Sequence, residues 1–144
     1  MRHKASLLIA EDEQIIALGM EMLLTDAGYD ICGIARTAPE AIALAQQFHP
    51  DLALLDVRLA NNTDGTDAAR VLKNSLAIPS ILITGHLDAL QAKACGASGL
   101  LKKPYDPRRL LQMIEALLDW SHDGVPPAAT SGLFIPGTDT FRRA

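Results

Sequence analysis

The chain has 144 residues, of which 49% are hydrophobic and 21% are charged, and its formal net charge is -4 at pH 7. This length fits one domain with a single core, and the composition is typical of a compact soluble protein. The negative charge argues against a general nucleic-acid-binding surface, and no apolar run approaches the length of a signal-peptide core or a membrane span. We therefore expect a cytoplasmic protein with no nucleic-acid or membrane partner.

Five short apolar runs alternate with longer segments of helical periodicity. The runs predict strands at residues 5–10, 29–35, 51–56, 78–84 and 98–103. Between them, apolar residues three and four apart predict helices, for example Ile15, Leu18 and Met22. Two helix starts carry their own signals: Thr37-Ala-Pro-Glu40 has the form of a capping box, and Asp106-Pro107 has the form of an N-cap followed by proline.

This alternation predicts a doubly wound α/β fold, with a five-stranded parallel sheet and five helices that cover both of its faces. Parallel neighbours need crossover connections, and continuous apolar runs fit strands that are buried on both faces. In such sheets the binding edge lies at the carboxyl ends of the strands.

Charged and hydroxyl side chains fall at these strand ends. Glu11 and Asp12 follow the first strand, Asp56 ends the third, Thr84 ends the fourth, and Lys103 ends the fifth. Each has an ordinary explanation when taken alone: a solvated helix start, a turn residue, a strand exit or a surface lysine. Their joint occurrence at four strand ends favours a functional site.

Carboxylates that converge need a cation, and oxygen ligands with room for waters suit Mg²⁺. We expect Asp12 and Asp56 as direct ligands, Glu11 as a ligand through a water, and the backbone carbonyl of Arg58 as a further ligand.

A carboxylate beside Mg²⁺, a lysine and a hydroxyl has what phosphoryl transfer requires. An aspartate can act as the nucleophile and form an aspartyl-phosphate. Mg²⁺ and Lys103 would supply positive charge, the Thr84 hydroxyl would donate a hydrogen bond to a phosphoryl oxygen, and Gly85 would keep the backbone open.

From about Ser6 to Trp120 the chain resembles the receiver domains of two-component response regulators, through "IAEDE", "PDLALLDVRL", "DG", "ILITGH" and "GASGLLKKP". The resemblance implies a flavodoxin-like sheet of order 2-1-3-4-5 and a cis Lys103–Pro104 bond. It also implies, by position, the phospho-acceptor (Asp56), the acidic pair (Glu11 and Asp12), the switch hydroxyl (Thr84) and the phosphate-contacting lysine (Lys103).

Some positions depart from the family pattern. Leu100 stands where a switching aromatic is usual, so an aromatic that rotates inward cannot be the readout. The segment "DVRLANNTDG" lacks the usual proline after Asp56 and looks long, which resembles receivers of the alphaproteobacterial stress-response type. The fourth helix, about Leu87–Ala94, should be short. Arg58 and His86 either flank the phosphate and influence its lifetime or simply face solvent.

The leading interpretation is a stand-alone receiver, not an enzyme with a separate substrate. It would accept a phosphoryl group on Asp56 from a histidine kinase or a histidine phosphotransfer protein, and would switch conformation to regulate the binding of a downstream protein. The alternative is a Mg²⁺-dependent phosphatase with an aspartate nucleophile, although Arg58 stands where that chemistry needs a second acid. A flavin-binding protein would need hydroxyls in place of Glu11, Asp12 and Glu13.

We expect a receiver domain over residues 1–120 and a Gly/Pro-rich tail over 121–144, which is too short for a helix-turn-helix domain. Composition alone would make the tail a linker, yet it holds Phe134, Phe141 and the run Leu133–Ile135. We expect this run to dock in an apolar groove of its own domain or of a neighbouring copy, for example by strand addition, and phosphorylation could release or capture it. Homodimerisation is left open. Cys32 and Cys95 are expected to be reduced thiols without a chemical role.

Overall fold

The computed structural model of the protein describes residues 5–86, 89–123, 133–134 and 141–142. Five parallel strands form the sheet in the order β2-β1-β3-β4-β5, which confirms the predicted fold and strand order. The strands are β1 (Ser6–Ala10), β2 (Asp30–Ala35), β3 (Leu52–Asp56), β4 (Ser80–Thr84) and β5 (Gly99–Lys102). Two short strands, β6 (Leu133–Phe134) and β7 (Phe141–Arg142), extend the β5 edge in antiparallel fashion.

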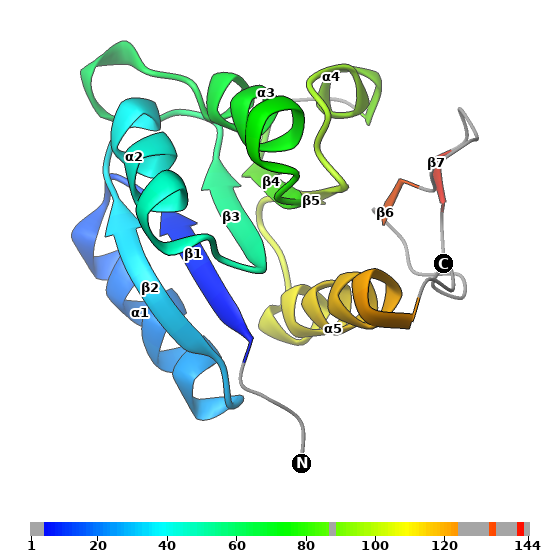
Figure 1. Cartoon of the computed structure of the whole chain (residues 1–144). Coiled ribbons are helices and arrows are strands. Elements are labelled where there is room, and N and C mark those ends of the chain that lie inside the picture. Colours follow the sequence, from blue (N-terminus) through cyan, green and yellow to red (C-terminus); the bar gives the residue numbers. More distant parts are fainter. Residues whose placement is uncertain (1–4, 87–88, 124–132, 135–140, 143–144) are drawn as a thin grey trace.

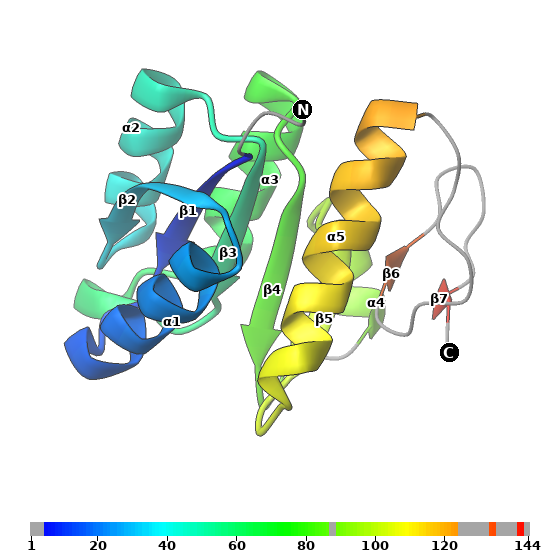
Figure 2. The same cartoon turned by 90° about the horizontal axis from the view of Figure 1, so that it is seen from below.

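Helices cover both faces of the sheet (Figures 1 and 2). They are α1 (Gln14–Asp26), α2 (Ala38–Phe48), α3 (Gly65–Leu76), α4 (Ala89–Ala94) and α5 (Pro107–Asp123), with a short 3-10 turn, η1, at Ala60–Asn62. The helices α2, α3 and α4 bury alanine-rich faces in one core cluster, while α1 and α5 contribute to the cluster on the other face. Helix α4 is short, as expected; residues 87–88 of its predicted range lie outside the described residues.

The two predicted helix starts are confirmed by their hydrogen bonds. The Thr37 hydroxyl oxygen accepts from the Glu40 amide at 3.2 Å, and the Asp106 carboxylate accepts from the Arg108 amide at 2.9 Å. The Glu40 carboxylate accepts from the Arg36 amide, one residue before the cap, at 3.1 Å. These caps satisfy amide groups that the first turn of a helix leaves without an internal partner.

Helix α1 turns its periodic apolar residues outward. Ile15, Leu18 and Met22 are 87%, 54% and 60% exposed, whereas the buried side of α1 carries Ala17, Met20 and Leu24. The predicted helix is present. The residues whose spacing predicted it, Ile15, Leu18 and Met22, form an exposed apolar surface, which we call the α1 stripe.

The C-terminal segment adds a strand to the sheet. Leu133 lies opposite Gly99 of β5, and its side chain is fully buried in the core cluster that contains Leu101 and Leu117. This is strand addition at a sheet edge, the mode of docking expected for Leu133–Ile135; Ile135 itself lies outside the described residues. Helix α5 runs past Trp120 to Asp123. Within the described ranges, no helix has the length and apolarity needed to cross a lipid bilayer.

Candidate functional site

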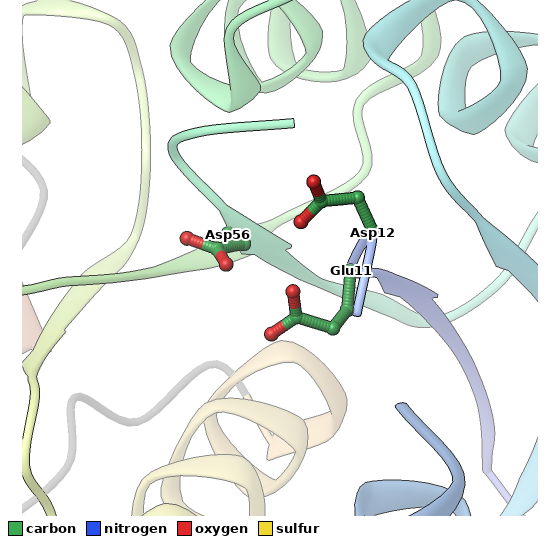
Figure 3. A group of neighbouring side chains, drawn as sticks. All are labelled: Glu11, Asp12 and Asp56. Atoms are coloured by element: carbon green, nitrogen blue, oxygen red, sulfur yellow. The ribbon is translucent and has the colours of Figure 1, made fainter. Parts of the chain in front are cut away.

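Three carboxylates converge at the carboxyl end of the central strands. Glu11 and Asp12 directly follow β1, and Asp56 is the last residue of β3, which pairs with β1 in parallel. One oxygen from each carboxylate lies within 4.8 Å of the others, and Figure 3 shows the three side chains facing a common space. This spacing suits a single small cation with oxygen ligands.

Lys103 supplies the positive charge opposite these groups. Its Nζ lies 3.1 Å from Oδ2 of Asp56 and 4.0 Å from Oε1 of Glu11. The backbone holds the lysine in place, because its amide donates to the Thr84 carbonyl at 3.0 Å. The bond between Lys103 and Pro104 is cis. The cis bond is the one that the family resemblance implies.

One ammonium group does not neutralise three carboxylates, and one of the three, Glu11, is also buried. Burial and the negative charge of Asp56 raise the pKa of Glu11 from 4.5 to about 7, against the smaller opposing effect of Lys103. Burial alone would lower the pKa of Lys103, but its hydrogen bond to Asp56 and the charge of that carboxylate outweigh burial and raise it. The residues therefore fit a divalent cation, which would remove the excess negative charge.

Thr84 is the last residue of β4 and directly follows Ile83, which the strand register pairs with Asp56. It is 4% exposed, and its hydroxyl oxygen accepts from the His86 amide at 3.2 Å. A hydroxyl group that accepts one bond keeps its own proton to donate to another acceptor. A Cβ on the neighbouring Gly85 would meet only the Lys103 carbonyl oxygen, at 3.9 Å, so the backbone here is open.

The remaining predicted residues are either exposed or part of the core. The side chains of Arg58 and His86 are exposed, two residues beyond Asp56 and Thr84, and Arg58 forms an isolated antiparallel bridge with Asp64. Leu100 is 4% exposed and packs in the core cluster that includes Ala92 of α4. A buried aliphatic side chain thus fills the position where a switching aromatic is usual.

A cavity of about 390 Å³ opens beside the carboxylates, and sequence reasoning missed its apolar wall. Glu11, Asp56 and Lys103 line its polar end. The apolar lining comes from both sides of the site: Ala10, Ile16, Met20, Ile83, Pro104 and Tyr105. Tyr105 could have been found from its place two residues after Lys103, whereas Ile16 and Met20 could not, because periodicity did not fix the orientation of α1.

A family model described as the response regulator receiver domain matches residues 7–115. The chain belongs to this family. The receiver is 33% identical to the phyllosphere-induced regulator PhyR of Methylorubrum extorquens over 114 residues, which are 78% of this chain and 43% of that protein. It is 35% identical to the transcriptional regulatory protein PdtaR of Mycobacterium tuberculosis over 111 residues, 75% of this chain and 54% of that protein.

A crystal structure described as the anti-anti-sigma factor PhyR from Bartonella quintana matches this receiver with a TM-score of 0.70 and 30% identity, over 86% of this chain and 51% of that one. PhyR proteins are thus among the matches of both the sequence comparison and the structure comparison. The chain spans about half the length of the curated relatives, so the similarity concerns their receiver portions. Proteins of this family are phosphorylation-regulated signalling proteins.

Proposed function

We propose that this receiver accepts a phosphoryl group on Asp56 from a histidine kinase or a histidine phosphotransfer protein, and that phosphorylation changes its binding to a downstream protein. The observation that carries this proposal is the environment of Asp56: a carboxylate at 3.1 Å from the Lys103 ammonium, among two further carboxylates, beside an open cavity. We propose that this exchange takes place in the cytoplasm, as the sequence predicts.

The residues divide the chemistry between them. Asp12, Asp56, the Arg58 carbonyl and, through a water, Glu11 would hold Mg²⁺, which when bound supplies positive charge for the phosphoryl oxygens. Lys103 donates a hydrogen bond to Oδ2 of Asp56 and so orients the carboxylate, one oxygen of which would attack phosphorus. The new P–O bond forms as the P–N bond to the donor imidazole breaks, and the imidazole leaves with the bonding electrons. Lys103 and the Thr84 hydroxyl then stabilise the negative phosphoryl oxygens.

The α1 stripe is the proposed contact surface for the phosphodonor. The donor histidine must approach Asp56 closely, and Ile16 and Met20 of α1 line the cavity that opens onto this carboxylate. The same helix also exposes the apolar side chains of Ile15, Leu18 and Met22 to solvent. An apolar helix face on the donor would cover these side chains while its histidine reaches Asp56.

We propose that phosphorylation changes the conformation of this receiver without the rotation of an aromatic side chain, because the usual position of that aromatic holds Leu100, which is packed in the core. No finding favours the phosphatase alternative. We keep the expected division into a receiver (1–120) and a tail (121–144) as a proposal, but place the boundary at Asp123, where α5 ends. The tail strand β6 pairs with β5 of the same chain.

Beryllofluoride with Mg²⁺ tests the acceptor assignment, since it forms a stable phosphoryl mimic on aspartate. We expect fluorine NMR to detect a bound species on the wild-type protein, none on Asp56→Asn, and weaker Mg²⁺ binding by Asp12→Ala. Asp67→Asn is the matched control, because Asp67 is 69% exposed and pairs only at the surface with Arg70. Equal labelling of Asp56→Asn would reject the assignment, and rapid turnover of a small phosphate ester would favour the phosphatase instead.

A further inference from the structure

Gly65, the first residue of α3, lies directly against the backbone of Asp56. A Cβ built on Gly65 would overlap with the Asp56 carbonyl oxygen and lie 3.0 Å from the Asp56 carbonyl carbon and 3.3 Å from Cα of Val57. All three neighbours are backbone atoms, which cannot move aside as the end of a flexible side chain can. Gly65 itself is buried.

The segment between Asp56 and Gly65 folds back on itself as a small hairpin. The Gly65 amide donates to the Val57 carbonyl at 2.8 Å, and Arg58 and Asp64 form an antiparallel bridge. This pairing fixes the backbone at Arg58, whose carbonyl is a proposed ligand of Mg²⁺. The close approach of Gly65 to Asp56 is what allows the hairpin to close at its base.

The far end of the hairpin is tied to the start of α2. The Thr63 hydroxyl accepts from the Ala38 amide at 3.0 Å and donates to the Ala60 carbonyl at 2.7 Å, while the Ala60 amide donates to the Arg36 carbonyl at 2.9 Å. These bonds hold the loop independently of any group at the phosphorylation site.

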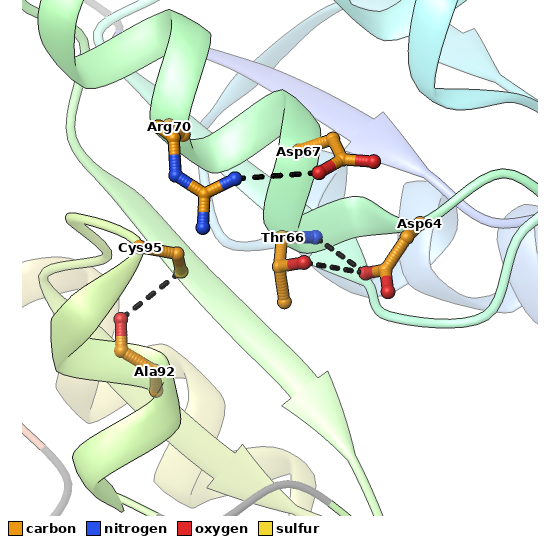
Figure 4. A network of polar contacts seen from close by, with 6 residues as sticks. All are labelled: Asp64, Thr66, Asp67, Arg70, Ala92 and Cys95. Carbon is orange, nitrogen blue, oxygen red and sulfur yellow. Dashed lines mark hydrogen bonds and ion pairs between the residues drawn. The ribbon is translucent and has the colours of Figure 1, made fainter.

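The near end is tied to α3 through its N-cap. One carboxylate oxygen of Asp64 accepts from both the amide and the hydroxyl of Thr66, each at 2.8 Å (Figure 4). Since the hairpin is held at both ends, a displacement at Gly65 must be absorbed at its base, where Asp56 lies.

From these contacts we infer that Gly65 is a positioning residue for the phosphorylation site: the missing side chain lets α3 press against β3 and so sets the direction of the Asp56 carboxylate and of the Arg58 carbonyl. The inference rests on the proposed function. Gly65 is distinct in this respect from Gly19 of α1, where a Cβ would meet nothing within 4 Å.

Gly65→Ala is therefore expected to weaken Mg²⁺ binding. Changes to groups that orient metal ligands commonly reduce affinity about 10–100-fold. We expect the dissociation constant of Mg²⁺ to rise at least about tenfold in the unphosphorylated protein. Gly19→Ala is the matched control, with the same added methyl group in open space, and its dissociation constant should stay within about twofold of the wild type.

The experiment is a Mg²⁺ titration followed by the amide NMR signals of Asp56, Val57 and Arg58, at a temperature where circular dichroism finds each variant folded. A merely structural role would lower the unfolding midpoint of Gly65→Ala and leave its Mg²⁺ affinity unchanged, and that result overturns the inference. The supporting result is weaker Mg²⁺ binding together with shifted signals at these three amides before any Mg²⁺ is added.

Thr63→Val decides the question if Gly65→Ala does not fold, because it removes the hydroxyl bonds at the far end of the hairpin without adding bulk near Asp56. Weaker Mg²⁺ binding by Thr63→Val supports the inference, and an unchanged dissociation constant overturns it. A wild-type protein that binds neither Mg²⁺ nor beryllofluoride would instead reject the proposed function, so the two failures are distinguishable.

Discussion

Replacing Leu133 with alanine tests whether the C-terminal segment is part of the receiver core. Leu133 is fully buried in the core cluster to which α1 and α5 contribute, although more than thirty residues separate it from Gly99, its partner in β5. The substitution removes apolar atoms from this cluster and leaves the short strand β6 with little to anchor it.

The size of the effect follows from burial and from the shortness of the strand. A leucine-to-alanine change at a buried site costs about 2–5 kcal/mol in free energy of unfolding. Strand β6 has two residues and one register partner in β5, so the segment can open locally, and the loss cannot exceed the free energy that holds it in place. We expect about 2 kcal/mol, at the lower end of that range, or roughly 4–8 °C in the unfolding midpoint.

Urea unfolding followed by tryptophan fluorescence measures this loss. Trp120 is the single tryptophan of the chain, and it packs against the same cluster as Leu133. Leu90→Ala is the matched control: Leu90 is 77% exposed, so its loss should change stability by less than about 0.5 kcal/mol.

A Leu133→Ala protein as stable as the control would refute the reasoning, because a core residue cannot be truncated without cost.

Truncation after Asp123 extends the test to the sheet edge. Removal of β6 exposes the outer edge of β5, which among the described strands otherwise pairs only with β4. We expect the truncated protein to associate more than the full chain in light scattering, with and without beryllofluoride. Identical behaviour of the two proteins would make the tail a passive extension.

Two further predictions concern the site. Arg58→Ala combined with His86→Ala is expected to change the dephosphorylation rate several-fold, because positioned groups at a reacting centre commonly matter that much; an unchanged phosphate lifetime would leave both as solvent-facing side chains. Burial raises the pKa of Glu11 to about 7 from 4.5, so its contribution to stability is fully present below pH 4.5 and is lost as the pH rises through about 7. Mg²⁺ favours the ionised carboxylate, and titrations at pH 6 and pH 8 should differ about tenfold in affinity, tighter at pH 8, with much of that difference lost in Glu11→Gln.

The sequence predicted the meeting of Glu11, Asp56 and Lys103 for a simple geometric reason. Parallel strands place their carboxyl ends at one edge of the sheet. Residues that follow neighbouring strands therefore come together when the strand register brings those strand ends to the same level. The register pairs Ala10 with Leu55, and the Lys103 ammonium reaches Asp56 at 3.1 Å.

The orientation of α1 could not be predicted in the same way. Ile15, Leu18 and Met22 are three and four residues apart, but so are Ala17, Met20 and Leu24, and only the second set is buried. A helix with apolar residues on both faces satisfies the helical period in two orientations, and packing against the sheet selects between them. The steric role of Gly65 is likewise invisible in the sequence, because it depends on a backbone contact made across the hairpin.

The strand pairing between Leu133 and Gly99 also bears on self-association. The sequence left two docking modes open, on the same domain or on a neighbouring copy, and both would use the same backbone groups of β5. They are therefore competitors for one edge. Covalent attachment gives the chain's own segment an effective concentration on the order of millimolar, so a second copy at micromolar concentration is outcompeted by mass action while the segment stays docked. Exchange of this strand between copies should therefore increase with the concentration of the protein and with any change that weakens the binding of Leu133 to its own domain.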